Sequence, residues 1–291
     1  MQTWLITGAS GGLGSSLTRQ LLERGDRVAA TVRKPGVLDE LQAQYGERLW
    51  QARLDLTNPQ QIAEVVERAF AELGVIDVFV NNAAYGLYGA VEEASDAQIE
   101  HQFQTNVLGS LRAARAVMPF LREQGRGHLV QISSMAGHYS IPGMGLYCAS
   151  KWAVEGAFEA LAKEAAPFGI RATMVEPGGI RTPFITGNAV YGEPLDAYRE
   201  QEAGQFTRMM RGEVPGMNDE AAFNRIVVGD PHKMARRIIE RVDAGDGPLR
   251  MALGSDAYAT IRAALLERLA ALEKQQELAY STDGDDVMQR V

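Results

Sequence analysis

TWLITGASGGLG, residues 3–14, joins a strand-like apolar run directly to a glycine-rich turn. A helical pattern follows through Leu17, Leu21 and Leu22 and ends near Gly25. Glycines at such a turn remove the side chains that would block an approaching ligand, and the start of the helix favours an anion. This strand, turn and helix therefore predict a pyrophosphate site, with a plain turn as the alternative.

The turn has its glycines at positions 8, 12 and 14, in the spacing Thr-Gly-x-x-x-Gly-x-Gly. The common dinucleotide fingerprint is G-x-G-x-x-G, so this spacing differs from it. Beyond the turn, strands are expected at residues 2–7, 27–32, 49–54, 75–80, 128–132, 170–175 and 249–253. Helical patterns alternate with these strands, and the early strands are apolar nearly throughout, as in parallel sheets covered on both faces.

This alternation predicts an α/β fold, a Rossmann-type doubly wound parallel sheet of about seven strands with helices on both faces. We expect one domain over residues 1–278, with a substrate-lid insertion at about 183–230 and a polar tail at 279–291. Ligands of such sheets bind outside the carboxyl ends of the strands. Six features follow the end of a predicted strand: residues 8–14, Arg33, Asp55, Asn81-Asn82, Ser134 and residues 177–182.

Arg33 follows the second predicted strand, where a Rossmann unit reads the adenosine ribose. An acidic residue there would accept a hydrogen bond from the 2′-hydroxyl of NAD, whereas a basic one accommodates the 2′-phosphate of NADP. Because the chain has Arg33 and no acid at this place, we expect NADP(H) to be preferred, with NAD(H) possible. A merely solvated arginine is the alternative.

Tyr147 and Lys151 are four residues apart in a predicted helix, which places both on one face. An adjacent ammonium favours the phenolate and is expected to lower the tyrosine pKa towards the range of a general acid or base. Alone, Tyr-x-x-x-Lys is a weak signal. Asn106 and Gly109 lie inside another predicted helix, residues 96–122, where their low propensity suggests a role other than folding.

Together these motifs resemble the short-chain dehydrogenase/reductase family over about residues 3–182. The matching segments are residues 7–14 (TGASGGLG), 81–84 (NNAA), 106–109 (NVLG), 132–134 (ISS), 147–151 (YCASK), and Pro177-Gly178 with Thr182. Ala84 departs from the family, which most often has glycine there. The family's active serine lies thirteen residues before the tyrosine, which selects Ser134 rather than Ser133.

The resemblance implies an oxidoreductase that interconverts a ketone or aldehyde and an alcohol by hydride transfer. Tyr147 would be the general acid/base, with Ser134 bonded to the same substrate oxygen. Lys151 would hold the nicotinamide ribose, and Asn106 would keep a water in a proton path. The residues that the resemblance assigns to cofactor binding are Gly8, Ser10, Gly12, Leu13, Gly14, Arg33, Asp55, Leu56, Asn82, Ala83, Lys151, Pro177, Gly178, Ile180 and Thr182.

Composition excludes several other functions. The net charge of -8 argues against a nucleic-acid or anionic-membrane partner, and no apolar run is long enough to span a bilayer. Cys148 is the one cysteine, so it cannot form an intramolecular disulfide, and we expect it to pack in a cytoplasmic protein. No metal is expected, because the four histidines lack ligand spacing, and His138 reads as a packing or substrate-side residue.

The substrate is expected to be bulky and apolar. The tail beyond the usual family length resembles members that act on hydroxysteroids and retinoids, and the family habit predicts a homodimer or homotetramer. The loop residues that suggest an apolar pocket are Met135, His138, Tyr139, Phe184, Met209 and Met210. The alternatives are a non-catalytic NADP-sensing regulatory protein and an epimerase or dehydratase of a related extended fold.

Overall fold

The computed structural model describes residues 1–182, 184, 189–214 and 220–284 of the chain. Its centre is a seven-stranded sheet in the order β3-β2-β1-β4-β6-β7-β9, with every neighbouring pair parallel. The strands are β1 (Thr3–Thr7), β2 (Arg27–Val32), β3 (Leu49–Arg53), β4 (Val78–Asn81), β6 (Gly127–Ile132), β7 (Ile170–Pro177) and β9 (Arg250–Leu253). The predicted doubly wound fold is confirmed, and its strand order reverses between β1 and β4.

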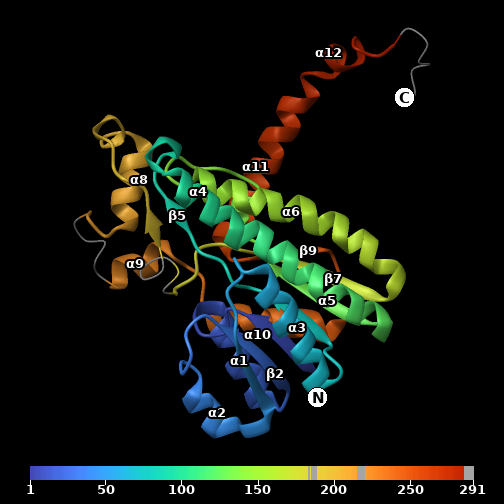
Figure 1. Cartoon of the computed structure of the whole chain (residues 1–291). Helices are drawn as coiled ribbons and strands as arrows, with labels where there is room; N and C mark the ends of the chain where they lie inside the picture. Colours follow the sequence, from blue (N-terminus) through green and yellow to red (C-terminus); the bar gives the residue numbers. More distant parts are fainter. Residues whose placement is uncertain (183, 185–188, 215–219, 285–291) are drawn as a thin grey trace.

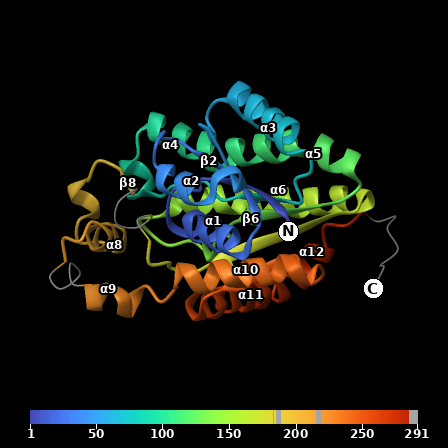
Figure 2. The same cartoon turned by 90° about the horizontal axis from the view of Figure 1, so that it is seen from below.

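Helices cover both faces of this sheet, as Figure 2 shows. On one face lie α1 (Gly12–Arg24), α2 (Asp39–Tyr45) and α10 (Pro231–Ala244); on the other lie α3 (Pro59–Leu73), α5 (Ser110–Gln124) and α6 (Gly145–Ala165). Trp4 and Ile6 belong to the first core, and Leu5 between them belongs to the second. Successive strand side chains point to opposite faces, so β1 must be apolar throughout.

The predicted helix over residues 96–122 is present, but it is not α-helical throughout. It consists of α4 (Asp96–Phe103), a π-helical segment (Gln104–Gly109) and then α5. The wider π-turn contains the two residues of low helix propensity, Asn106 and Gly109. A Cβ on Gly109 would lie 2.7 Å from the Cβ of Leu56, so glycine lets this segment approach the loop after β3.

The segment expected as a lid contains β8 (Val190–Tyr191), α8 (Glu202–Met210) and α9 (Glu220–Ile226), which lie together at one end of the molecule (Figure 1). Residues 183, 185–188 and 215–219 of the expected lid lie outside the described residues. β8 pairs in parallel with β5 (Leu87–Tyr88), a small sheet that the sequence analysis did not predict. The short 3₁₀ turns are Gly46–Arg48, Val91–Glu93, Met135–Gly137, Ala166–Phe168 and Asp196–Tyr198.

The last predicted helix, residues 255–278, is divided into α11 (Ser255–Glu273) and α12 (Gln276–Tyr280). Figure 1 shows α12 and the end of α11 projecting beyond the rest of the molecule. Residues 285–291 of the expected polar tail lie outside the described residues. In the described part of the chain, no helix is both long enough and apolar enough to span a bilayer.

Gly14 provides a test of how α1 packs on the sheet. A Cβ at this position would lie 2.4 Å from the carbonyl oxygen of Gly8 and 2.6 Å from Nδ2 of Asn82. Because the first of these atoms is backbone, we expect Gly14→Ala to lower the free energy of unfolding by about 1–3 kcal/mol, measured in urea. Gly156 in α6 is the matched control, since a Cβ there meets nothing within 4 Å. Gly156→Ala should raise stability by about 0.5–1 kcal/mol, and equal effects would contradict the packing.

Candidate active site

The glycine turn after β1 is held in place by the end of β4. Gly8 has a φ of +68°, which glycine adopts without strain. The Asn82 side-chain amide donates to the carbonyl oxygens of Thr7 (2.9 Å) and Gly8 (3.1 Å). The backbone N–H groups of Asn82 and Ala83 donate to Thr7 Oγ1 at 2.9 and 3.1 Å. The Asn82 amide, predicted to lie along the cofactor, therefore supports the shape of the turn.

The start of α1, predicted to hold a pyrophosphate, has the features of an anion site. Gly12 has a φ of +52°, and the first turn of α1 contains no acidic side chain. A Cβ on Gly12 would lie 3.3 Å from the Cβ of Thr182, which follows β7. Ser10 and Leu13 both lie at the turn. The Ser10 side chain is exposed to solvent, whereas the Leu13 side chain is buried. The fold thus brings two predicted cofactor segments, far apart in sequence, to one place.

The predicted adenine end of the site contains Asp55 and Arg33. Asp55 Oδ1 accepts hydrogen bonds from the Thr57 backbone N–H (2.9 Å) and hydroxyl (2.7 Å). The backbone hydrogen bond is the main cause that lowers the pKa of Asp55, and the nearby charge of Arg33 contributes. Arg33 is exposed, and Leu56 is buried beside Asp55. The carboxylate is therefore ionised and fixed by its own loop.

The side chains of Ser134, Tyr147 and Lys151, all predicted to be catalytic, come together where β6 faces α6. Lys151 Nζ donates to the carbonyl oxygen of Ile132 at 3.0 Å and lies 5.7 Å from the centre of the Tyr147 ring. Ser134 lies near enough to Tyr147 to act on its pKa, and the Ser134 hydroxyl accepts a hydrogen bond from the Ala136 N–H at 3.1 Å. Tyr147 and Lys151 are exposed by only 6% and 2%, which removes most of their contact with water.

The pKa of Tyr147 lies above its ordinary value, opposite to the direction expected from the sequence. Burial raises it, and the nearby Ser134 side chain opposes burial only in part. Burial also lowers the pKa of Lys151 to about 8, while Glu155 opposes that change. The expected lowering fails because the ammonium is itself desolvated and is bonded to the Ile132 carbonyl instead of the phenol.

Asn106 connects the π-helical segment to the helix that carries Tyr147. Its Nδ2 donates to the Tyr85 carbonyl (2.9 Å) and to Ser150 Oγ (3.2 Å), and its Oδ1 accepts from the Tyr85 N–H (3.1 Å). The Ser150 hydroxyl in turn donates to the Tyr147 carbonyl at 2.7 Å. Sequence reasoning missed Ser150, although its place inside Tyr-x-x-Ser-Lys was a possible signal.

A buried charge cluster adjoins Lys151 and the residues predicted to be catalytic. His138 Nε2 lies 2.8 Å from Glu176 Oε1, and Arg250 Nε lies 2.9 Å from Glu155 and 3.4 Å from Glu176. Ligand atoms of the histidine and the two glutamates come within 4.8 Å of one another, a grouping that histidine spacing did not suggest. The Arg250 guanidinium places a fixed positive charge among them, so the cluster is an ion-pair network.

The loop after Pro177 is anchored by the last strand and helix. The Gly178 N–H donates to the Leu253 carbonyl at 2.9 Å, and the Gly179 N–H donates to Asp256 Oδ2 at 2.8 Å. Ile180 forms an isolated parallel bridge with Gly229. The sequence analysis missed Asp256, which lies 77 residues from Gly179 and belongs to no motif.

Apolar side chains cover Tyr147. The Phe184 ring meets the Tyr147 ring edge-on at 5.8 Å, and Tyr139 and Met144 pack on the same cluster. Cys148 is fully buried there, and burial raises the pKa of its thiol, as expected for a packing residue.

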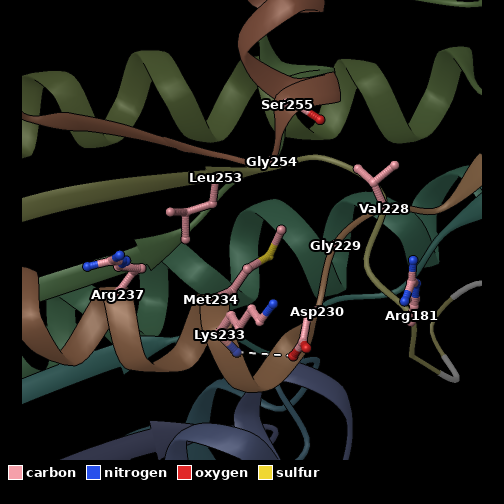
Figure 3. Close-up of a pocket in the computed structure, with 10 residues that line it drawn as sticks. All are labelled: Arg181, Val228, Gly229, Asp230, Lys233, Met234, Arg237, Leu253, Gly254 and Ser255. Carbon is pink, nitrogen blue, oxygen red and sulfur yellow. Dashed lines mark hydrogen bonds between the residues drawn. The ribbon is translucent and has the colours of Figure 1, made fainter.

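A separate hollow of about 400 Å³ opens beside α10 and the start of α11 (Figure 3). None of its lining residues is a predicted catalytic residue. They are Arg181, Val228, Gly229, Asp230, Lys233, Met234, Arg237, Leu253, Gly254 and Ser255.

Comparisons with known proteins match this arrangement. The profile of the family described as short chain dehydrogenase matches residues 2–189. The 3-ketodihydrosphingosine reductase of Bacteroides thetaiotaomicron is 38% identical over 72% of this chain and 75% of its own length. A short-chain dehydrogenase structure from Streptomyces avermitilis has a TM-score of 0.86 and 36% identity, and covers 97% of this chain and 100% of its own.

A serine dehydrogenase solved with NADP+ has a TM-score of 0.69 and 26% identity, covering 87% of this chain and 94% of its own. The family profile spans more than half of the sequence, and the sheet order and the site geometry agree with it. The chain therefore belongs to the short-chain dehydrogenase family and is an NAD(P)-dependent oxidoreductase.

Proposed function

We propose that this protein is an NADP(H)-dependent oxidoreductase that interconverts a ketone or aldehyde with an alcohol on a bulky apolar substrate. The observation that carries the proposal is the meeting of Ser134, Tyr147 and Lys151 in a nearly water-free place at the carboxyl end of β6. A bound nicotinamide would supply or take up the hydride. The cradle of Gly8, Gly12 and Gly14 would hold the pyrophosphate of that cofactor.

The chain's own residues would handle the proton. Because burial raises the pKa of Tyr147, its hydroxyl is protonated at neutral pH and can donate to a developing alkoxide. Ser134 would donate a second hydrogen bond to the same oxygen and fix its position. The Lys151 ammonium would stabilise the phenolate left behind, and Asn106 would hold a water beside the lysine. In oxidation, the proton moves the opposite way.

Two observations support NADP as the preferred cofactor. Arg33 is exposed at the end of β2, close enough for its charge to act on Asp55, so it could bind a 2′-phosphate. The serine dehydrogenase with a similar fold was solved with NADP+. NAD(H) would bind more weakly, because its 2′-hydroxyl is neutral and cannot form an ion pair with the Arg33 guanidinium.

The cover over Tyr147 supports the substrate class. Phe184, Tyr139 and Met144 would face an apolar substrate body while its carbonyl reaches Ser134. The Bacteroides relative is by name a reductase of a keto compound. A cytoplasmic location and assembly into a homodimer or homotetramer, with α6 and the helix of residues 96–122 at the interfaces, complete the proposal.

Tyr147→Phe tests the acid/base assignment. Removing the hydroxyl deletes the proton donor but leaves the fold and the cradle intact, so turnover of a ketone panel should fall by about 10²–10⁴-fold. NADPH affinity, measured by fluorescence, should stay within about twofold. Tyr280→Phe is the matched control, because Tyr280 is exposed on α12, and it should retain most turnover. Near-normal turnover in Tyr147→Phe would contradict the assignment of Tyr147 as the general acid/base.

Arg33→Ala tests the cofactor preference. Losing a charged bond to the 2′-phosphate should weaken NADPH binding by about tenfold or more, while NADH binding changes little. Arg126→Ala is the control, because Arg126 pairs with Asp77 at the amino ends of β6 and β4, whereas Arg33 follows the carboxyl end of β2. Equal losses for the two cofactors in Arg33→Ala would refute the preference.

The buried lysine predicts a pH dependence. The Lys151 pKa of about 8 is lower than that of a free lysine, so the ammonium loses its proton as the pH rises through that value. Carbonyl reduction should therefore slow above about pH 8, measured as kcat/KM. Lys151→Met should lack this alkaline decline, and a flat profile from pH 7 to pH 10 in the unmodified protein would exclude the role.

A further inference from the structure

The C-terminal helices carry a concentration of exposed apolar side chains. Seven of the nineteen exposed large hydrophobic residues of the described chain fall within residues 258–280. On α11 they are Tyr258 (66% exposed), Leu265 (50%), Leu266 (49%), Leu269 (51%) and Leu272 (64%). The body of the molecule leaves this surface uncovered, and the end of α11 projects away from it (Figure 1). Such a concentration marks an interaction surface.

These side chains form one face of the helix. Tyr258, Leu265, Leu269 and Leu272 are seven, four and three residues apart, which brings them to the same side, and Leu266 flanks them. The spacing fits a helix-to-helix seam with apolar residues at heptad positions. We call these five residues the leucine face.

Contacts with the body of the molecule fix the orientation of α11. Ala257 and Ile261 are buried against the body, and the Arg268 guanidinium lies over the Trp152 ring of α6 at 4.7 Å. These three residues share one face of α11, because Ile261 follows Ala257 by four residues and Arg268 follows Ile261 by seven. That face lies about a quarter turn around the helix from the leucine face. The leucine face is therefore directed outward while α11 is held in place.

We propose that the leucine face is a self-association surface on which α11 of a second copy packs antiparallel. An antiparallel pair that sets Leu265 against Leu269 of the copy also brings Arg262 beside Leu272 and Glu273 of that copy. Neither Arg262 nor Glu273 has an ion-pair partner in the described part of the chain. By symmetry the pair would gain two such contacts.

Charge excludes the parallel arrangement and favours a copy of this chain over other occupants. A parallel pair would place Arg262 level with Arg262 of the copy and Glu273 level with Glu273, so neither charge would meet an opposite one. An anionic membrane is disfavoured by the net charge of -8. An antiparallel copy would bury the leucine side chains and pair both Arg262 and Glu273 in a single interface. This surface contains none of the predicted site residues.

The test uses the full-length protein and sedimentation equilibrium. Leu269→Glu should lower the association state by one step, tetramer to dimer or dimer to monomer, or weaken association by about tenfold or more. Leu278→Glu is the matched control: Leu278 is 67% exposed on α12 but lies off the leucine face, so association should be unchanged. Ketone reduction by both variants shows that they are folded.

Charge reversal tests the antiparallel arrangement. Arg262→Glu and Glu273→Arg should each weaken association, and the double variant should restore it, because the two charges exchange places across the interface. The proposal is overturned if the double variant is as weak as the single ones. It is also overturned if Leu278→Glu dissociates as readily as Leu269→Glu, or if the monomeric protein instead binds phosphatidylcholine vesicles.

Discussion

A lysine ammonium enclosed in the protein interior is the interaction on which the site depends. Lys151 is only 2% exposed, and an unpaired charge at such a place would cost several kcal/mol. The Ile132 carbonyl accepts its hydrogen bond, and Glu155 lies one turn further along α6 with a compensating charge. Because the lysine is bonded to the last residue of β6, the serines that follow that strand are fixed relative to Tyr147.

The compensating glutamate has to be neutralised as well, which extends the site to the edge of the sheet. Burial raises the pKa of Glu155, and Arg250 of β9 counteracts this through an ion pair at 2.9 Å. Arg250 also contacts Glu176, the residue before Pro177, and Asp256 binds the next turn of that loop. The last strand is thus joined electrostatically both to the helix of the acid/base pair and to the loop expected to hold the nicotinamide.

Local patterns predicted most of the fold, because the signals for strands and glycine turns come from residues that are close together in the sequence. The apolar run of β1 and the glycines that follow it are examples. The sequence did not predict the direction of the Tyr147 pKa shift, because spacing places Lys151 nearby but does not show how deeply both are buried. It also missed Asp256 and Arg250, whose partners lie 77 and 95 residues away. Asn106 was singled out, but its π-turn depends on bonds to Tyr85 and Ser150.

The parallel sheet has a consequence for the order in which the protein acquires its parts. Every strand pair joins segments separated by a crossover, and β9 comes after residue 249. Contacts between distant segments form slowly, since the chain must first lose the entropy of closing long loops. A nascent chain leaving the ribosome would therefore lack Arg250 and Asp256 until nearly all of it had been synthesised. The contacts that hold Glu155, Glu176 and the loop after Pro177 are therefore complete only near the end of translation.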